Sequence, residues 1–287
     1  MVNTKIIDGK AIAERIRNEI RDEMDRLPAS IKPLKLVAVQ AGDDSASSIY
    51  TRQQEKLCEK NGIMYELKKF GPDISAERLA GEIEKLNLDD GVTAVILQMP
   101  LPAGMDPLAL QSAISPLKDA EGVHPANMGR VIYGKPCLAP CTVLAVMEII
   151  YSTGVALEGR EVVVVGHSGI VGKPAALLLL DRLATVTVCH VGTSMAGMLE
   201  SHVRRADILV VAAGKAGLVP GDWVKEGAVV VDVGINRQGD RIVGDVGFET
   251  ASKRAAYITP VPGGVGPVTT AMLLKNVVEA AKWKIKV

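Results

Sequence analysis

Two polar side chains near residue 50 have the types and the spacing needed to bind and orient a small molecule. Tyr50 and Gln54 are four residues apart in the stretch 46–60, whose pattern predicts a helix, so they share one face. The Gln54 amide can orient a water molecule, but it does not titrate and so cannot accept a proton as a base. Arg52 and Lys56 do not replace it, because residues two positions away point to other faces of the helix.

Two further segments place polar groups or an unusual backbone where a ligand can bind. The predicted strand 93–98 ends on Gln98 just before a Met-Pro pair, which puts this amide at the rim of a crevice; a strand-end glutamine bonded to loop backbone is the other interpretation. The string 259–269 holds three prolines and three glycines, which fix an unusual backbone. A third string, 116–125, carries Glu121.

Residues 162–174 indicate a buried strand, a glycine-bearing turn and the start of a helix. Gly166 permits the tight turn, and the helix N-terminus offers free N–H groups and a positive dipole end to a phosphate. The spacing of Gly166, Gly169 and Gly172 is G-x-x-G-x-x-G, which misses the strict dinucleotide fingerprint. Glycines at such a turn also occur for structural reasons, so the pattern alone leaves both interpretations open.

The next predicted strand, 185–189, ends without the acidic residue that usually binds the ribose hydroxyls of NAD. His167, Ser168 and Thr193 are polar side chains that can hold the 2′-phosphate of NADP. A His167 that simply faces solvent is the alternative. NADP is therefore the first choice of cofactor, and NAD stays possible.

The elements that must hold these residues alternate between strands and helices along the chain. Strands are predicted at 35–40, 64–69, 93–98, 161–165, 185–189, 208–212 and 228–232, and helices at 10–27, 46–60, 75–87, 106–114, 141–152 and 267–285. This alternation indicates an α/β fold with largely parallel sheets. The carboxyl ends of such strands line a ligand crevice, which would place Gly214, Gly234 and Ile235 there, although ordinary strand-ending turns explain the same residues.

Composition excludes several classes of protein. The 287 residues are 48% hydrophobic and only 3% aromatic, which fits one or two domains with the aliphatic core of buried parallel sheets. The 33 basic and 33 acidic residues are interspersed, so nucleic acid is not the expected partner. The cysteines lack metal-ligand spacing, the N-terminus lacks a signal pattern, and the longest apolar run, 175–180, is too short for a membrane span. We expect a soluble, cytosolic protein without a metal.

Several strings, in this order, resemble the methylenetetrahydrofolate dehydrogenase/methenyltetrahydrofolate cyclohydrolase family along essentially the whole chain. They are residues 7–10, 42–63, 98–102, 116–125, 162–174 and 259–269. The resemblance implies a folate-binding catalytic domain at 1–140, completed by a C-terminal helix at 267–287, and a Rossmann-like nicotinamide-dinucleotide domain at 141–266. It also implies a cytoplasmic homodimer that acts on tetrahydrofolate one-carbon derivatives.

The same resemblance assigns roles to residues. Catalytic and substrate-binding roles fall on Tyr50, Gln54, Gln98, Glu121, Pro262, Gly263 and Gly264. Cofactor-binding roles fall on Gly166, His167, Ser168, Ile170, Gly172, Thr193, Gly214, Gly234 and Ile235. His124 matches the family too, either as a structural or as a functional residue.

Two positions depart from the family pattern. In the family, the residue at position 54 is a catalytic lysine, and the residue at position 121 is an aspartate that binds the amino-pyrimidinone edge of the pterin; here they are Gln54 and Glu121. Hydride transfer to the nicotinamide requires alignment and no protein base.

Opening the methenyl ring requires proton movement, which positioned acid–base groups accelerate by roughly 10²–10⁴-fold. The sequence therefore predicts an NADP-linked dehydrogenase with weak or absent cyclohydrolase activity. The alternatives are a fully bifunctional enzyme, in which another group or a water chain replaces the lysine, and a non-catalytic folate- or nucleotide-binding paralogue.

Overall fold

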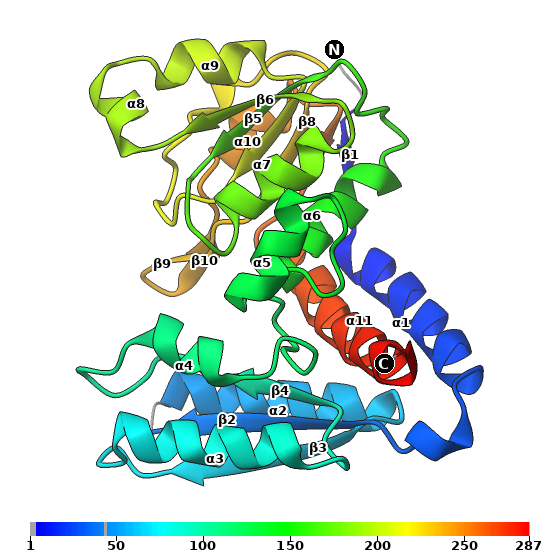
Figure 1. The fold of residues 1–287 in the computed structure, drawn as a ribbon. Coiled ribbons are helices and arrows are strands. Elements are labelled where there is room, and N and C mark those ends of the chain that lie inside the picture. Colours follow the sequence, from blue (N-terminus) through cyan, green and yellow to red (C-terminus); the bar gives the residue numbers. More distant parts are fainter. Residues whose placement is uncertain (1–3, 43–44, 287) are drawn as a thin grey trace. The chain divides into compact units, whose positions relative to one another are not determined.

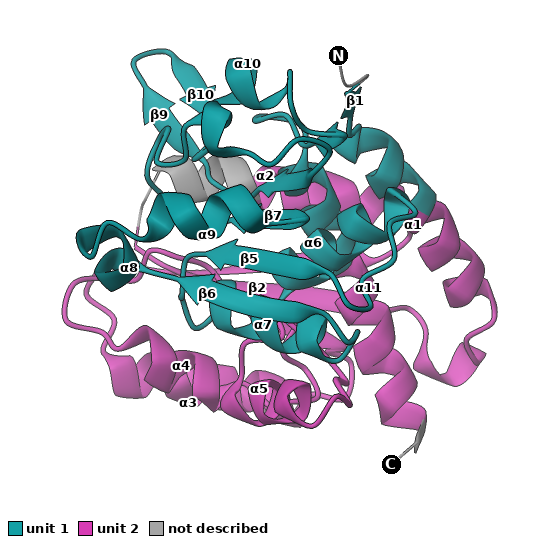
Figure 2. Cartoon of the chain, turned by 90° about the horizontal axis from the view of Figure 1, so that it is seen from above, with its two compact units in different colours: residues 1–15, 140–272 teal, residues 16–139, 273–287 magenta. Residues whose placement is uncertain are grey.

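A computed structural model describes residues 4–42 and 45–286, with side chains described for all of these except residues 45–50 and 286. Strands and helices alternate along the chain (Figure 1). The chain divides into two compact units, coloured separately in Figure 2: unit 1 is residues 1–15 with 140–272, and unit 2 is residues 16–139 with 273–287. The predicted two-domain α/β fold with parallel sheets is confirmed.

Unit 1 is built on a six-stranded sheet in which every pairing is parallel. The order across the sheet is β1 (Lys5–Ile6), β11 (Tyr257–Ile258), β8 (Val229–Asp232), β7 (Ile208–Val211), β5 (Glu161–Val165) and β6 (Thr185–Cys189). Its central strands β5, β7 and β8 are valine-rich and almost entirely buried, as expected of a covered parallel sheet. The chain runs from β5 outward to β6 and then returns to β7 on the other side of β5. The carboxyl end of β5 is therefore a topological switch point, where such sheets bind ligands.

Helices cover both faces of this sheet. In Figures 1 and 2, α7 (Gly172–Leu180) and α9 (Leu199–Arg205) lie on opposite faces of β5 and β6. The remaining elements of unit 1 are α6 (Cys141–Ser152), α8 (Val191–Met195), α10 (Phe248–Ala251), the short helix η2 (Gly221–Trp223) and the hairpin of β9 (Asn236–Gln238) with β10 (Arg241–Val243).

Unit 2 contains a three-stranded parallel sheet in the order β3 (Met64–Phe70), β2 (Lys35–Ala41) and β4 (Ala94–Leu97). Its helices are α2 (Ser45–Lys60), α3 (Ala76–Leu88), α4 (Pro107–Ala113) and α5 (Pro125–Ile132), with η1 (Ala29–Ile31) before β2. Leu79, Ile83 and Leu86 recur at helical spacing on α3 and pack on Val37 and Val39 of the sheet. Ser75 caps α3 by accepting a hydrogen bond from the N–H of Arg78.

Two long helices, α1 (Gly9–Asp25) and α11 (Val265–Lys286), each begin in unit 1 and end in unit 2. The sequence places residues 1–140 together, whereas the first fifteen residues group with unit 1 in the structure. The reason is a backbone pairing, because β1 adds to β11. The N–H groups of Lys5 and Ile7 donate to the carbonyls of Ala256 and Ile258, each at a distance of 2.8 Å. Within the described residues, no helix is both long enough and apolar enough to cross a membrane.

Candidate active site

Gln54 lies on the buried face of α2, where its carbonyl oxygen accepts two hydrogen bonds. Gln98 Nε2 donates to Gln54 Oε1 at a distance of 2.9 Å, and the Tyr65 hydroxyl donates to the same atom at 3.3 Å. The two glutamines are only 2% and 5% exposed. Burial raises the pKa of Tyr65, which keeps its hydroxyl protonated and able to donate. The structure thus brings two of the predicted site residues into contact.

The amide nitrogen of Gln54 is the unusual atom of this cluster. It is buried and has no hydrogen-bond partner among the described residues. A buried donor left unpaired costs about 1–3 kcal/mol, so an acceptor supplied by a ligand or by water would be favourable there. Tyr50, the other predicted residue of this helix, has a side chain outside the described residues.

Gln98 follows directly on β4, and its backbone N–H continues the sheet by donating to Val39 O over 2.8 Å. Its side-chain nitrogen binds the Gln54 side chain rather than loop backbone. The backbone therefore holds Gln98 at the end of the strand, while its amide fixes the orientation of Gln54.

The loop that carries Glu121 is folded around a buried aspartate, Asp119, which is 1% exposed. The Asp119 carboxylate accepts hydrogen bonds from Gly122 N at 3.0 Å, His124 N at 2.7 Å and Asn127 Nδ2 at 3.1 Å. His124 in turn caps α5 through its Nδ1 atom. These contacts give His124 a structural role in the loop.

The pKa of the Glu121 carboxyl lies well above its ordinary value. Burial, together with the negative charge of Asp119, raises the pKa of Glu121 to about 8. The backbone just before Glu121 is fixed from α11, because Asn276 Nδ2 donates to Ala120 O at 2.9 Å and also to Ala139 O at 3.0 Å. The sequence gives no role to Asp119 or to Asn276. Asp119 lies in the string 116–125 but its burial is set by the fold, and Asn276 bonds residues that are far away in the sequence.

In unit 1, the glycine turn after β5 is imposed by close backbone approaches. Gly166 has a φ of +123°, and a Cβ atom there would lie 2.2 Å from the carbonyl oxygen of Ala212. A Cβ atom on Gly172 would lie 2.1 Å from the carbonyl oxygen of Gly166. No side chain larger than hydrogen fits at either position, so the switch point presents bare backbone in front of α7.

Polar side chains border this turn. The Ser168 hydroxyl accepts hydrogen bonds from the backbone N–H groups of residues 171 and 172, at the start of α7. The exposed rings of His167 and His190 lie 5.3 Å apart between centroids. His190 and Thr193 form a capping box on α8, in which Thr193 Oγ1 accepts from His190 N over 3.2 Å. The Thr193 hydroxyl hydrogen is therefore available to an acceptor outside this pair.

The other predicted cofactor residues lie at the carboxyl ends of neighbouring strands. Gly214 follows β7, and Gly234 and Ile235 follow β8. Ile170, in the glycine turn, is 54% exposed and Ile235 is 70% exposed. Both apolar side chains are thus available for contact with a ligand.

The proline- and glycine-rich loop lies at the end of β11. Gly263 has a φ of +103°, the Val261–Pro262 peptide bond is cis, and Gly264 N donates to Pro260 O over 2.9 Å. A pocket of about 400 Å³ borders the loop, and its lining includes Asp232, Phe248, Pro260 and Val261. The predicted residues Pro262, Gly263 and Gly264 follow this lining along the chain and are not part of it.

Comparison with known proteins decides the family. The family model of the tetrahydrofolate dehydrogenase/cyclohydrolase catalytic domain matches residues 7–121, and that of the corresponding NAD(P)-binding domain matches residues 140–285. The chain belongs to the tetrahydrofolate dehydrogenase/cyclohydrolase family. A relative from Pelobacter propionicus, the bifunctional protein FolD, is 48% identical over 278 residues, which cover 96% of this chain and 97% of that protein.

Solved structures of this family agree. The bifunctional enzyme FolD from Campylobacter jejuni has a TM-score of 0.93 and 41% identity, and the match covers 98% of this chain and 99% of that one. The methylenetetrahydrofolate dehydrogenase–cyclohydrolase from Trypanosoma brucei, solved with NADP and an inhibitor, has a TM-score of 0.93 and 39% identity with full coverage of both chains. Membership in the tetrahydrofolate dehydrogenase/cyclohydrolase family is thus supported along the entire length, and the predicted family is confirmed.

Proposed function

We propose that this chain oxidises 5,10-methylenetetrahydrofolate to 5,10-methenyltetrahydrofolate with NADP as the hydride acceptor. The observation that carries the proposal is the match of both halves, one to the family's catalytic domain and the other to its NAD(P)-binding domain. The hydride leaves the carbon that bridges two folate nitrogens, and the product is a delocalised cation. The protein need not remove a proton, so its residues act by binding and alignment.

The residues of unit 1 fit a nicotinamide dinucleotide. Gly166 and Gly172 leave space above the backbone that a Cβ atom would fill, and this space lies at the N-terminus of α7. A helix N-terminus favours the binding of a phosphate. His167, Ser168 and Thr193 would hold the 2′-phosphate of NADP, and no acidic residue of β6 competes for it. When bound, the nicotinamide ring supplies the acceptor for the hydride. The NADP bound in the Trypanosoma brucei relative supports this choice.

Gln54 is the reason to propose a weak cyclohydrolase step. Its oxygen is committed to Gln98 and Tyr65, and its nitrogen can donate hydrogen bonds but cannot take a proton from water. The amide can therefore orient a folate atom or a water molecule, while the acid–base contribution of a lysine at this position is missing.

A second candidate is the fully bifunctional enzyme that continues to 10-formyltetrahydrofolate. The relatives favour it, because the Pelobacter propionicus and Campylobacter jejuni proteins are both described as bifunctional. In this chain Glu121 is the group that would move protons, since a pKa of about 8 suits acid–base exchange near neutral pH.

Two assays test the proposal. Methylenetetrahydrofolate with NADP should yield methenyltetrahydrofolate and NADPH; protein that produces neither is a non-catalytic paralogue, and the proposal fails. Methenyltetrahydrofolate supplied alone should decay at close to its buffer rate. Fast protein-dependent decay would establish the bifunctional candidate instead.

Variants at two positions separate the candidates further. Gln54→Lys should raise the rate of methenyl hydrolysis, by about 10²-fold if the lysine acts as a base, with a much smaller effect on the dehydrogenase rate. If the wild-type protein already hydrolyses the methenyl compound quickly, Glu121→Gln should abolish that rate. Unchanged hydrolysis in Gln54→Lys would show that the amide is not what limits this step.

The assembly and the location in the cell are also proposals. The resemblance to the family supports a cytoplasmic homodimer. Sedimentation equilibrium of the purified protein tests the first point, and a monomeric mass at micromolar concentration would contradict it.

A further inference from the structure

Two buried aspartates in unit 1 lie beneath the loops that carry the predicted cofactor contacts. Asp245 is fully buried, and its carboxylate accepts four hydrogen bonds. Its Oδ2 atom accepts from Ala213 N at 2.7 Å and from Gly214 N at 2.8 Å, and its Oδ1 atom accepts from Lys215 N and from Asn236 Nδ2, both at 2.8 Å. Four acceptor positions are about the whole capacity of a carboxylate, so this group is saturated by the protein itself.

Asp232 supports Asp245 from the end of β8. Its Oδ1 atom accepts from Gly234 N and from Asp245 N, both at 3.0 Å, and its Oδ2 atom accepts from Val246 N at 2.9 Å. The backbone N–H of Asp232 donates to Thr259 Oγ1 over 2.8 Å. The two aspartates therefore join the carboxyl ends of β7, β8 and β11, the edge at which a parallel sheet binds its ligand.

The two carboxylates pack directly against Gly234 and Gly244, with no space for a larger side chain at either glycine. A Cβ atom on Gly234 would lie 2.3 Å from Asp245 Oδ1, and one on Gly244 would lie 2.0 Å from Asp232 Oδ2. Burial and the nearby charge of Asp245 raise the pKa of Asp232 to about 6, although its backbone hydrogen bonds oppose this rise. Two buried acidic groups held next to each other are costly unless the protein supplies hydrogen bonds to both, as it does here.

We propose that Asp245, with Asp232 behind it, is a positioning residue that sets the loops 213–215 and 234–236 for binding the nicotinamide dinucleotide. This inference rests on the proposed function. Three successive N–H groups that converge on one carboxylate fix the first loop, and Asn236 fixes the second to the same charge. Gly214, Gly234 and Ile235 are then presented to the ligand with a backbone that does not have to be ordered on binding.

The experiment compares the wild-type protein with Asp245→Asn, which keeps size and shape but replaces one acceptor oxygen with a donor. Asp207→Asn is the control, because Asp207 also accepts a backbone N–H with its carboxylate but precedes β7, at the opposite end of that strand. Its Oδ2 atom accepts from Glu161 N at 3.1 Å, and its Oδ1 atom accepts from Lys225 Nζ at 2.6 Å. The readouts are the melting temperature, the NADPH dissociation constant from nucleotide fluorescence, and amide hydrogen exchange of segments 212–217 and 35–41.

Asp245→Asn should weaken NADPH binding by at least about tenfold at a temperature where the protein is folded, and should speed exchange in 212–217 while 35–41 is unchanged. Asp207→Asn should lower the melting temperature and leave the dissociation constant within about twofold. A folded Asp245→Asn protein that binds NADPH as the wild type does would overturn the proposal.

Two further outcomes are distinguishable. If Asp245→Asn does not fold, Asn236→Ala is used instead, because it removes only one of the four donors to Asp245. It should weaken the binding of NADPH about threefold. An unchanged dissociation constant would also count against the proposal. Wild-type protein that binds neither NADPH nor NADH overturns the proposed function and the cofactor role of Asp245 together. The exchange data would then still show whether Asp245 orders the 213–215 loop.

Discussion

Glu121 is a single residue whose protonation should report on substrate binding. With a pKa of about 8, raised by burial and by Asp119, its carboxyl carries a proton at pH 7 in the ligand-free protein. The amino-pyrimidinone edge of a pterin presents adjacent donors, which pair with the ionised carboxylate. We therefore expect tetrahydrofolate binding at pH 7 to release a proton, and the affinity to rise with pH until it levels off above about 8.

Calorimetry in two buffers with different ionisation enthalpies measures this proton directly. Glu121→Gln cannot ionise and is the control, so its observed binding enthalpy should be the same in both buffers. Buffer-independent heat in the wild-type protein would mean that Glu121 does not change its protonation on binding.

The same residue gives the folded protein a pH dependence of its own. The pKa of Glu121 in the folded chain lies above its usual value of 4.5, so the folded state binds the proton more tightly than the unfolded state does. Its contribution is fully favourable below pH 4.5 and is lost as the pH rises through about 8. Urea unfolding at pH 6 and pH 8.5 should show a larger loss of stability for the wild type than for Glu121→Gln. Equal losses in the two proteins would contradict the assigned pKa.

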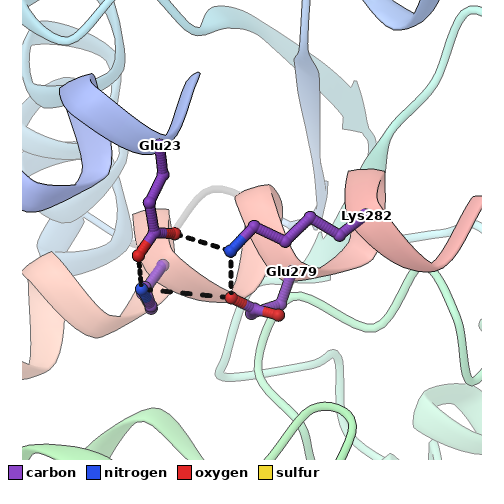
Figure 3. Close-up of polar contacts among 4 residues, drawn as sticks. Glu23, Glu279 and Lys282 are labelled. Atoms are coloured by element: carbon purple, nitrogen blue, oxygen red, sulfur yellow. Dashed lines mark hydrogen bonds and ion pairs between the residues drawn. The ribbon is translucent and has the colours of Figure 1, made fainter. Parts of the chain in front are cut away.

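At the scale of elements, an ion-pair cluster joins α1 to α11 within unit 2. Figure 3 shows Lys282 between Glu23 and Glu279, with dashed lines to both. Lys275 also pairs with Glu23. Lys282 Nζ lies 2.7 Å from Glu23 Oε2 and 2.8 Å from Glu279 Oε1. Burial alone raises the pKa of Glu23, but the hydrogen bonds from the two lysines outweigh it and lower the pKa.

Glu23→Gln should therefore destabilise the protein by about 1 kcal/mol at neutral pH, because two partly buried lysines lose one of the two carboxylates that they share, Glu23 and Glu279. A lowered folded-state pKa means that the stabilisation is present above pH 4.5 and is lost as the pH falls through the lower, folded-state value. The difference between wild type and variant should shrink in acid and in high salt. Glu200→Gln on α9 is the control, since the Arg204–Glu200 pair is 47% and 46% exposed. Equal effects of the two variants on the denaturation midpoint would argue against the network.

How far an element can be predicted depends on whether its signal is local. The valine runs of β5 and β8 and the apolar spacing of α3 predict those elements within a residue or two of their observed ends. The strands β1 and β11 have two residues each, and their pairing partners are far away in sequence, so no pattern reveals them.

The candidate site divides in the same way. Gln54 and Gln98 were predicted because each belongs to a specific string, and the structure adds the hydrogen bond between them. Asp245 follows no recognisable motif, and the three backbone N–H groups it accepts from are 30 to 32 residues earlier in the chain. A contact of that kind is decided by tertiary packing alone.

At the scale of the whole molecule, one chain supplies two α/β units with separate sheets. Residues predicted to contact the dinucleotide lie in unit 1. The predicted folate contacts are divided, with Gln54, Gln98 and Glu121 in unit 2 and residues 262–264 in unit 1. A cofactor that binds only the folded chain must raise its stability.

The choice between NADP and NAD follows from this linkage. A ligand at one hundred times its dissociation constant stabilises the folded state by about 2.7 kcal/mol, so at equal concentration the preferred cofactor gives the larger rise in melting temperature. We expect that cofactor to be NADP, because His167, Ser168 and Thr193 surround the switch point and no acidic residue of β6 is present to bind the ribose of NAD. His167→Ala should lower the rise in melting temperature that NADP gives and leave the rise with NAD unchanged, so the two cofactors should differ less. Ser194→Ala, which changes the residue next to Thr193 on α8, should leave both rises unchanged. A shift with NAD that equals or exceeds the shift with NADP would reverse the cofactor assignment and would show that these three side chains do not recognise a 2′-phosphate.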